Sequence, residues 1–222
     1  MSKEYVFIVD LRKCVGCGSC QVTCKQENEV PFGFFRTRVD YEDVGKYPTP
    51  RRYFLPKLCN HCDNPPCLSP CPVKGATYKR KDGVVVVDRD LCIGCGRCAD
   101  ACPYGARYLN KNVNIKNNPV KYPKVDEVKG KDKNTLFVMD KCDFCMHRLA
   151  AGIDEPACVR NCPGKARYFG DINDPKSTVS KLLKSVKGYK WNEDFGTKPV
   201  VTYFIKDANI FEIAGQEINR EG

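Results

Sequence analysis

The chain has 222 residues, of which 42% are hydrophobic, and this length and composition suit one large globular domain or two small ones. Its formal net charge is +10. No apolar run approaches the roughly 20 residues that would span a bilayer. The first residues contain neither a long apolar region nor a twin-arginine pair, so we expect no export signal of the chain's own.

The first predicted element is a β-strand, the apolar run YVFIVD at residues 5–10, which leads directly into a set of four cysteines. The set has the spacing C-x2-C-x2-C-x3-C and comprises Cys14, Cys17, Cys20 and Cys24. In bacterial ferredoxins the first three thiolates of this run hold one [4Fe-4S] cluster and the fourth binds a neighbouring cluster. Lys25 stands where the signature has proline, which fits a chain that continues into an insertion instead of turning back.

Residues 31–58 are aromatic and basic, and we interpret them either as a surface that faces a partner or as a packing insertion. A second cysteine set follows, with a widened C-x4-C spacing, and comprises Cys59, Cys62, Cys67 and Cys71. Residues 72–91 then provide enough length for a returning strand, a KDG turn and the strand GVVVVD. The third set repeats the ferredoxin spacing, ends in Cys-Pro and comprises Cys92, Cys95, Cys98 and Cys102.

The second and third sets together have the sequence order of a complete two-cluster ferredoxin. On that pattern, cluster two is held by Cys59, Cys62, Cys67 and Cys102. Cluster three is held by Cys92, Cys95, Cys98 and Cys71.

Residues 111–134 are rich in Lys and Asn and predict a solvated hairpin or loop. The apolar run NTLFVMD at residues 134–140 predicts a strand before the fourth set, which comprises Cys142, Cys145, Cys158 and Cys162. The 12 residues between the second and third of these cysteines indicate a helical turn inserted into the loop. By elimination, the first and fourth sets form the other pair. Cluster one is then assigned to Cys14, Cys17, Cys20 and Cys162, and cluster four to Cys142, Cys145, Cys158 and Cys24.

A repeated unit underlies these sets: an apolar strand, a cluster-binding loop, a short helix carrying the fourth cysteine, a turn that proline usually starts, and a returning strand. Such units have too little apolar core to fold alone, so metal must supply much of the folding free energy. After Cys162 the sequence predicts a helix over about 175–187 that ends at Gly188, and a strand at 199–205. The last residues, 206–222, resemble a tail that wraps a partner or frays.

The predicted fold is therefore α+β, with two bacterial-ferredoxin-like modules, one nested inside the other. The outer module comprises residues 1–50 and 135–172, and the inserted module comprises residues 51–110. Residues 111–134 form an insertion, and residues 173–222 form a C-terminal extension.

The cysteine spacing decides between classes of site. Disulfide-rich domains are usually short and secreted, whereas close C-x2-C and C-x3-C spacings are typical of metal ligation. Zinc is the alternative metal, but zinc sites normally use two separated cysteine pairs and not three cysteines in seven residues. Four [4Fe-4S] clusters with sixteen thiolates would add about −8 in charge and leave a net charge of about +2. The basic excess is then largely internal compensation and not a nucleic-acid-binding surface.

Few other residues suggest chemistry. His61 and His147 lie within cysteine loops, and we interpret each as a polar neighbour of a cluster or a surface residue, not as a ligand. Asp10, Asp88 and Asp140 precede cluster loops and are expected to serve turns, not proton transfer. Neither a phosphate-binding glycine loop nor a Ser/His/Asp arrangement is present, so we predict an electron conductor with no catalytic residue.

Between about residues 5 and 172 the sequence resembles the four-cluster iron–sulfur subunits of the molybdopterin oxidoreductases of the dimethyl sulfoxide reductase type. The matching motifs are CVGCGSCQVTCK, CNHCDNPPCLSPCP, CIGCGRCADACPYGAR, KCDFCMHRLAAG and CVRNCPGKARYFGD. The likeness is greatest to subunits of polysulfide, thiosulfate and arsenate reductases.

This resemblance implies an electron-transfer subunit for anaerobic respiration. Such a subunit associates with a large catalytic subunit that carries molybdenum or tungsten bis-molybdopterin, and often with a quinone-reactive membrane anchor or a soluble carrier. It also implies a membrane-associated complex on the periplasmic or outer face, reached by co-export with the catalytic subunit, with a cytoplasmic location as the open alternative, and no nucleic-acid partner. Two alternatives stay open at this point: a polyferredoxin subunit of a hydrogenase or formate dehydrogenase complex, and a zinc-stabilised nucleic-acid-binding protein.

Overall fold

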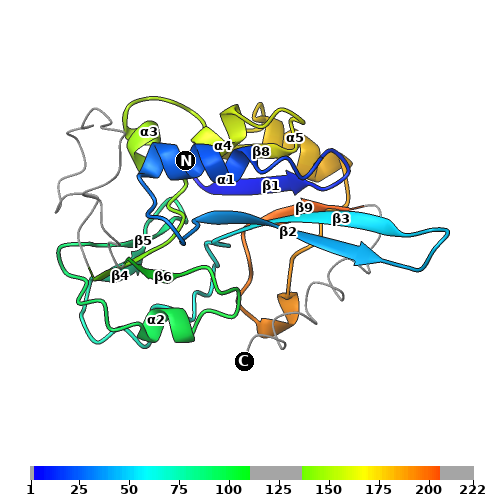
Figure 1. The fold of residues 1–222 in the computed structure, drawn as a ribbon. Coiled ribbons are helices and arrows are strands. Elements are labelled where there is room, and N and C mark those ends of the chain that lie inside the picture. Colours follow the sequence, from blue (N-terminus) through cyan, green and yellow to red (C-terminus); the bar gives the residue numbers. More distant parts are fainter. Residues whose placement is uncertain (1–2, 111–136, 206–222) are drawn as a thin grey trace.

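A computed structural model describes residues 3–110 and 137–205, and shows a mixed α/β chain (Figure 1). Its strands are β1 (Tyr5–Asp10), β2 (Thr37–Val44), β3 (Arg51–Leu58), β4 (Thr77–Lys79), β5 (Val85–Val87), β6 (Tyr108–Asn110), β7 (Val138–Asp140), β8 (Arg167–Asp171) and β9 (Thr202–Phe204). Its α-helices are α1 (Ser19–Asn28), α2 (Arg97–Asp100), α3 (Met146–Ala150), α4 (Ala157–Arg160) and α5 (Thr178–Ser185). The insertion at 111–134 and the tail at 206–222 lie outside the described residues.

Strand β1 is the centre of a three-stranded sheet with the order β8-β1-β9. It pairs antiparallel with β8 and parallel with β9. Alternate side chains of β1 point to opposite faces, so Val6 and Ile8 pack with α5 while Phe7 and Val9 face a second cluster around Phe144. Because both faces are covered, the strand is a continuous apolar run and lacks a polar face.

The strands that flank the cysteine sets form short pairs. Strand β4 follows the second set and pairs with β5, which precedes the third set. Strand β6 follows the third set and pairs with β7, which precedes the fourth. The second of these pairs joins the predicted inserted module to the predicted outer module by backbone hydrogen bonds.

The aromatic and basic segment at residues 31–58 contains a long antiparallel hairpin, β2–β3, in register from Thr37↔Leu58 outward. Its base packs into the core through Val39, Leu55 and Leu58. The loop between the strands is exposed, and Figure 1 shows the hairpin extending to one side of the three-stranded sheet. The segment is thus a packing element at one end and a projecting surface at the other.

The helices differ from the predicted repeat. Only α1 contains the fourth cysteine of its set, because α2 ends before Cys102 and α4 ends before Cys162. The second set has no helix between β3 and β4, so Cys71 lies outside any helix as well. The prediction of a helix that carries each fourth cysteine is therefore wrong for the second, third and fourth sets. A tight turn follows each of the helices α2 and α4, in which the N–H of Cys102 or Cys162 donates to the carbonyl three residues earlier, that of Ala99 or Val159.

Two other helix predictions hold. Helix α3 lies between Cys145 and Cys158, where the sequence indicated an inserted helical turn. Helix α5 is shorter than the predicted 175–187, because it begins after Ser177, whose Oγ accepts the Ser180 N–H at 3.2 Å. No helix within residues 3–110 and 137–205 is long and apolar enough to cross a membrane.

Candidate metal centres

All sixteen cysteines are free thiols, and twelve of them line three cavities in groups of four. One cavity is lined by Cys14, Cys17, Cys20 and Cys162. A second cavity is lined by Cys71, Cys92, Cys95 and Cys98. A third cavity is lined by Cys59, Cys62, Cys67 and Cys102.

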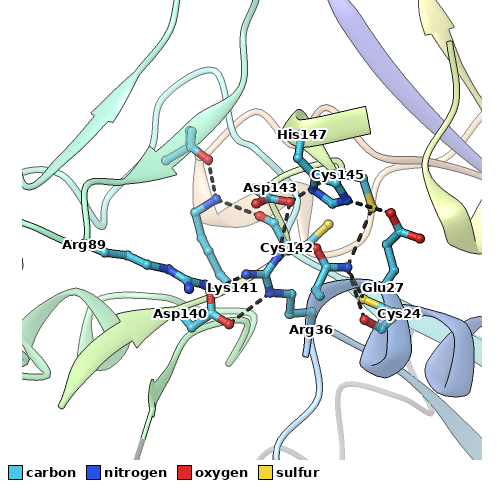
Figure 2. A network of polar contacts seen from close by, with 12 residues as sticks. Cys24, Glu27, Arg36, Arg89, Asp140, Lys141, Cys142, Asp143, Cys145 and His147 are labelled. Carbon is cyan, nitrogen blue, oxygen red and sulfur yellow. Dashed lines mark hydrogen bonds and ion pairs between the residues drawn. The ribbon is translucent and has the colours of Figure 1, made fainter. Parts of the chain in front are cut away.

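The four remaining cysteines, Cys24, Cys142, Cys145 and Cys158, are buried. Burial raises the pKa of Cys142 well above its usual value, and the other three thiols of this group raise it further. The Asn28 side-chain amide lies 3.5 Å from Cys24 Sγ and 3.7 Å from Cys145 Sγ. The structure thus brings Cys24 of α1 together with the fourth set, as Figure 2 shows for the labelled residues.

One backbone feature recurs in all four C-x2-C loops. The residue before the second cysteine has a positive φ angle at Gly16, His61, Gly94 and Phe144. A Cβ atom at Gly16 would clash with the ring of Phe54, and one at Gly94 would clash with the Phe137 carbonyl oxygen. The close approach therefore requires glycine at these two positions, and glycine also adopts the positive φ angle without strain.

His61 and Phe144 adopt the same conformation without being glycine, and their rings pack together with centroids 3.8 Å apart. His61 is fully buried, and its Nδ1 accepts the Val85 N–H at 3.0 Å. Burial and the neighbouring Lys141 hold the pKa of His61 well below its usual value, so the ring is neutral. His147 instead lies 2.6 Å from the Glu27 carboxylate.

The donor set of the cavities suits a positively charged group. Burial and neighbouring thiols raise the pKa of Cys62 to about 12, and burial, Asp143 and Cys158 raise the pKa of Cys145 to about 12. Four thiolates share such a space when a cation lies among them. Four cysteines line each of three cavities, and all-thiolate ligation of this kind suits an iron–sulfur cluster.

Asp10 and Asp88 serve turns, as expected: each accepts a backbone N–H two residues further on. Asp140 has a different role, so the prediction of a turn role for it is wrong. Its carboxylate is buried and forms ion pairs with Arg36 at 2.8 Å and Arg89 at 3.0 Å (Figure 2). These two cations hold the pKa of Asp140 well below its usual range against the effect of burial.

Two buried arginines are residues that sequence reasoning missed. Arg107 lines the cavities of Cys59 and of Cys92, and Arg167 lines the cavity of Cys14. Burial would lower the pKa of each guanidinium, but nearby cysteines raise it above the usual value. The signal was present in the repeated motif, because each is the arginine of a CPxxAR or CPxKAR run after a fourth cysteine.

Comparisons with known proteins agree with this chemistry. A family model described as a 4Fe-4S dicluster domain matches residues 50–130 and 119–172, and one described as a 4Fe-4S binding domain matches residues 12–33. The B subunit of selenate reductase from Mesobacillus selenatarsenatis is 41% identical over 90% of this chain and 71% of its own length. The B subunit of tetrathionate reductase from Salmonella typhimurium is 41% identical over 96% and 77%. The B subunit of polysulfide reductase from Wolinella succinogenes is 40% identical over 90% and 93%.

Proposed function

Because the protein belongs to the iron–sulfur B subunits of the dimethyl sulfoxide reductase family of respiratory oxidoreductases, we propose that it relays single electrons through four [4Fe-4S] clusters. It is the non-catalytic, electron-transfer subunit of a molybdopterin reductase complex, and its cysteine motifs bind 4Fe-4S clusters. This assignment displaces both alternatives, the zinc-stabilised nucleic-acid-binding protein and the hydrogenase-type polyferredoxin.

The observation that carries the proposal of four clusters is the gathering of four cysteines around each of three cavities. The last four form a group as well, because Asn28 contacts Cys24 and Cys145, and Cys24, Cys145 and Cys158 all raise the pKa of Cys142. Each group contains three cysteines of one set and one cysteine of its partner set. These groups support the ligand sets proposed for clusters one, two, three and four. Each cluster, when bound, accepts and releases one electron, and the chain's residues fix its place and surroundings.

The contacts between the groups support an order of one, four, two and three along the row. Arg167 lies between the groups of clusters one and four, and Arg107 between those of clusters two and three. The packed rings of His61 and Phe144 join the loops of clusters two and four. Cys17 of cluster one and Cys95 of cluster three are exposed, whereas all four cysteines of cluster four are buried. Electrons would then arrive and leave at the two exposed ends of the row.

The partners follow from the family. One end of the row would face a large molybdopterin catalytic subunit, and the other a quinone-reactive membrane anchor or a soluble carrier, in a complex on the outer face of the membrane. Relatives named for selenate, tetrathionate and polysulfide match at nearly equal identity. The substrate is therefore a property of the catalytic partner and not of this chain.

The experiment that tests this proposal is anaerobic purification of the chain with its native partners, followed by metal analysis. We expect about sixteen iron and about sixteen sulfide per chain, from four cubane clusters, and a large partner chain that contains molybdenum or tungsten. A complex that lacks both of those metals would reject the molybdopterin partner. One zinc per cysteine set, without sulfide, would reject the clusters.

A further inference from the structure

Arg107 and Arg167 occupy equivalent places in the two predicted modules. Each is the fifth residue after the fourth cysteine of its set, Cys102 or Cys162, and each stands just before or at the start of the returning strand. Their exposed fractions are 6% and 3%, so both guanidinium groups are buried. Burying a charge is costly unless it is paired, so two such residues at matched positions call for a counter-charge.

A threonine orients each guanidinium in the same way. Arg107 Nη2 donates to Thr77 Oγ1 at 2.9 Å, and Arg167 Nη2 donates to Thr37 Oγ1 at 3.0 Å. Each hydroxyl donates its own proton to a carbonyl oxygen on a paired strand, that of Val86 or Lys57. The threonine oxygen is thus left as an acceptor, which fixes the arginine side chain in place.

The described residues offer these two arginines no carboxylate within ion-pair distance, unlike Arg36, which pairs with Asp140. The Nη1 atom of each is buried without a hydrogen-bond partner. The anionic neighbours are cysteines instead. Arg107 Nη2 lies 3.1 Å from Cys67 Sγ, and Cys98 also raises the pKa of the Arg107 guanidinium. Arg167 lines the same cavity as Cys20, and Cys158 and Cys20 raise the pKa of its guanidinium.

The neighbours of each arginine belong to two different ligand groups. Cys67 and Cys98 belong to the groups proposed for clusters two and three. Cys158 and Cys20 belong to those proposed for clusters four and one. Each arginine is therefore placed to act on both members of a pair of clusters.

We propose that Arg107 and Arg167 are shared positive charges, one for each pair of clusters, that donate hydrogen bonds through Nη1 to cluster sulfur and raise the reduction potentials of both neighbours together. The inference rests on the proposed function, since it requires that the clusters are bound. Reduction adds one negative charge to a cluster, and a buried cation stabilises that added charge more strongly than a solvated one does. Hydrogen bonds to the sulfurs act in the same direction. Because one arginine serves both clusters of a pair, it raises their two reduction potentials together.

The test is an EPR-monitored redox titration of the purified complex with Arg107→Gln or Arg167→Gln. Each variant should lower the reduction potentials of the two neighbouring clusters by at least about 59 mV, which is a tenfold change in a one-electron reduction equilibrium. The potentials of the other pair of clusters should not change. Arg107→Lys and Arg167→Lys keep the positive charge, so the cluster potentials in these variants should stay close to the wild-type values. Arg52→Gln removes an exposed arginine paired with Asp43 and serves as the matched control, with no shift expected.

Iron and sulfide analysis of each variant separates this proposal from the proposed function. Wild-type complex without the expected iron refutes the function, whereas full iron content with unchanged potentials in the glutamine variants overturns only the role of the arginines. A shift in one neighbour alone, or lysine variants that behave like glutamine variants, also overturns it. If the glutamine variants lose iron, the redox titration is repeated with Thr77→Val and Thr37→Val. These variants keep the arginine's positive charge but remove the hydroxyl that orients its guanidinium group. A joint shift of both neighbours then supports the proposal, and unchanged potentials overturn it.

Discussion

At the scale of single residues, the pairing of the first and fourth cysteine sets depends on Cys24. It lies on α1 four residues after Cys20, yet the two thiols belong to different groups, because Cys20 lines the cavity of Cys14 and Cys24 lies with Cys145 beside Asn28. A helix places residues four apart on one face, one above the other. One helix can therefore supply ligands to two neighbouring centres.

We expect Cys24→Ser to perturb the cluster held by Cys142, Cys145 and Cys158, because serine replaces a soft thiolate donor with a hard one. The measurement is the EPR spectrum of the reduced complex. Cys17→Ser, at an exposed position of the group proposed for cluster one, is the matched control and should alter a different signal. If Cys24→Ser and Cys17→Ser change the same signal, the proposed pairing is wrong.

Single residues also show where sequence reasoning reaches its limit. The ligand positions could be predicted because their spacing reflects the geometry of a loop around a cluster. The packed pair of His61 and Phe144 could not, because it is a contact between loops far apart in the chain. Arg107 and Arg167 were missed for another reason: the repeated motif after each fourth cysteine marks their positions, but among 37 basic residues nothing in the local sequence indicates that these two are buried.

At the scale of elements, the predicted modules meet through buried charge. Asp140 at the end of β7 binds Arg36, which precedes β2, and Arg89, which follows β5; it also accepts the Tyr108 hydroxyl from β6. Lys141, the next residue, donates to the carbonyl oxygens of Val85 and Cys142. The strands themselves were predictable from apolar runs, but this network joins residues from four segments, and no local pattern indicates it.

Removing one partner from a buried ion network leaves the other charges without compensation. We expect Asp140→Asn to lower the free energy of unfolding by about 3 kcal/mol, since Arg36 and Arg89 lose their shared counter-charge. The measurement is denaturant unfolding of the holoprotein under anaerobic conditions.

Asp43→Asn provides the control, because Asp43 pairs with Arg52 on the exposed part of the β2–β3 hairpin. Exposed ion pairs contribute little, so this variant should unfold as the wild type does. Equal effects of the two substitutions would show that the buried network does not hold the modules together.

At the scale of the whole molecule, the cysteines are part of the hydrophobic core. Cysteines of all four sets share one buried cluster, directly or at its edge, with Phe7 of β1 and with Trp191 and Tyr203 of the C-terminal extension. The extension also binds the loop of the second set, since the Asp63 N–H donates to the Lys198 carbonyl and the Asn64 N–H donates to the Thr197 carbonyl. The predicted modules and the extension therefore share a core whose interior includes the metal-binding thiols.

Removal of iron should consequently unfold both predicted modules and the extension together, because binding free energy is folding free energy when the core contains the ligands. Limited proteolysis of the chelator-treated protein should then cut within residues 51–110, 137–172 and 173–205 at similar rates. Chelator already saturated with iron is the control and should leave the digestion pattern unchanged. Full protease resistance after complete loss of iron would contradict this expectation.

The position of β1 at the centre of its sheet has a consequence for biosynthesis. On the ribosome β1 is made before the other strands of residues 3–110 and 137–205, but both of its neighbours, β8 and β9, are translated only after the fourth cysteine set. The eight cysteines proposed for clusters two and three have all been synthesised by Cys102, so this pair of ligand groups is complete first. The thiols of the first set must wait until Cys162 has been made. The order of translation thus sets the earliest point at which each proposed ligand group is complete, and the group of Cys14, Cys17 and Cys20 is complete only with the last set.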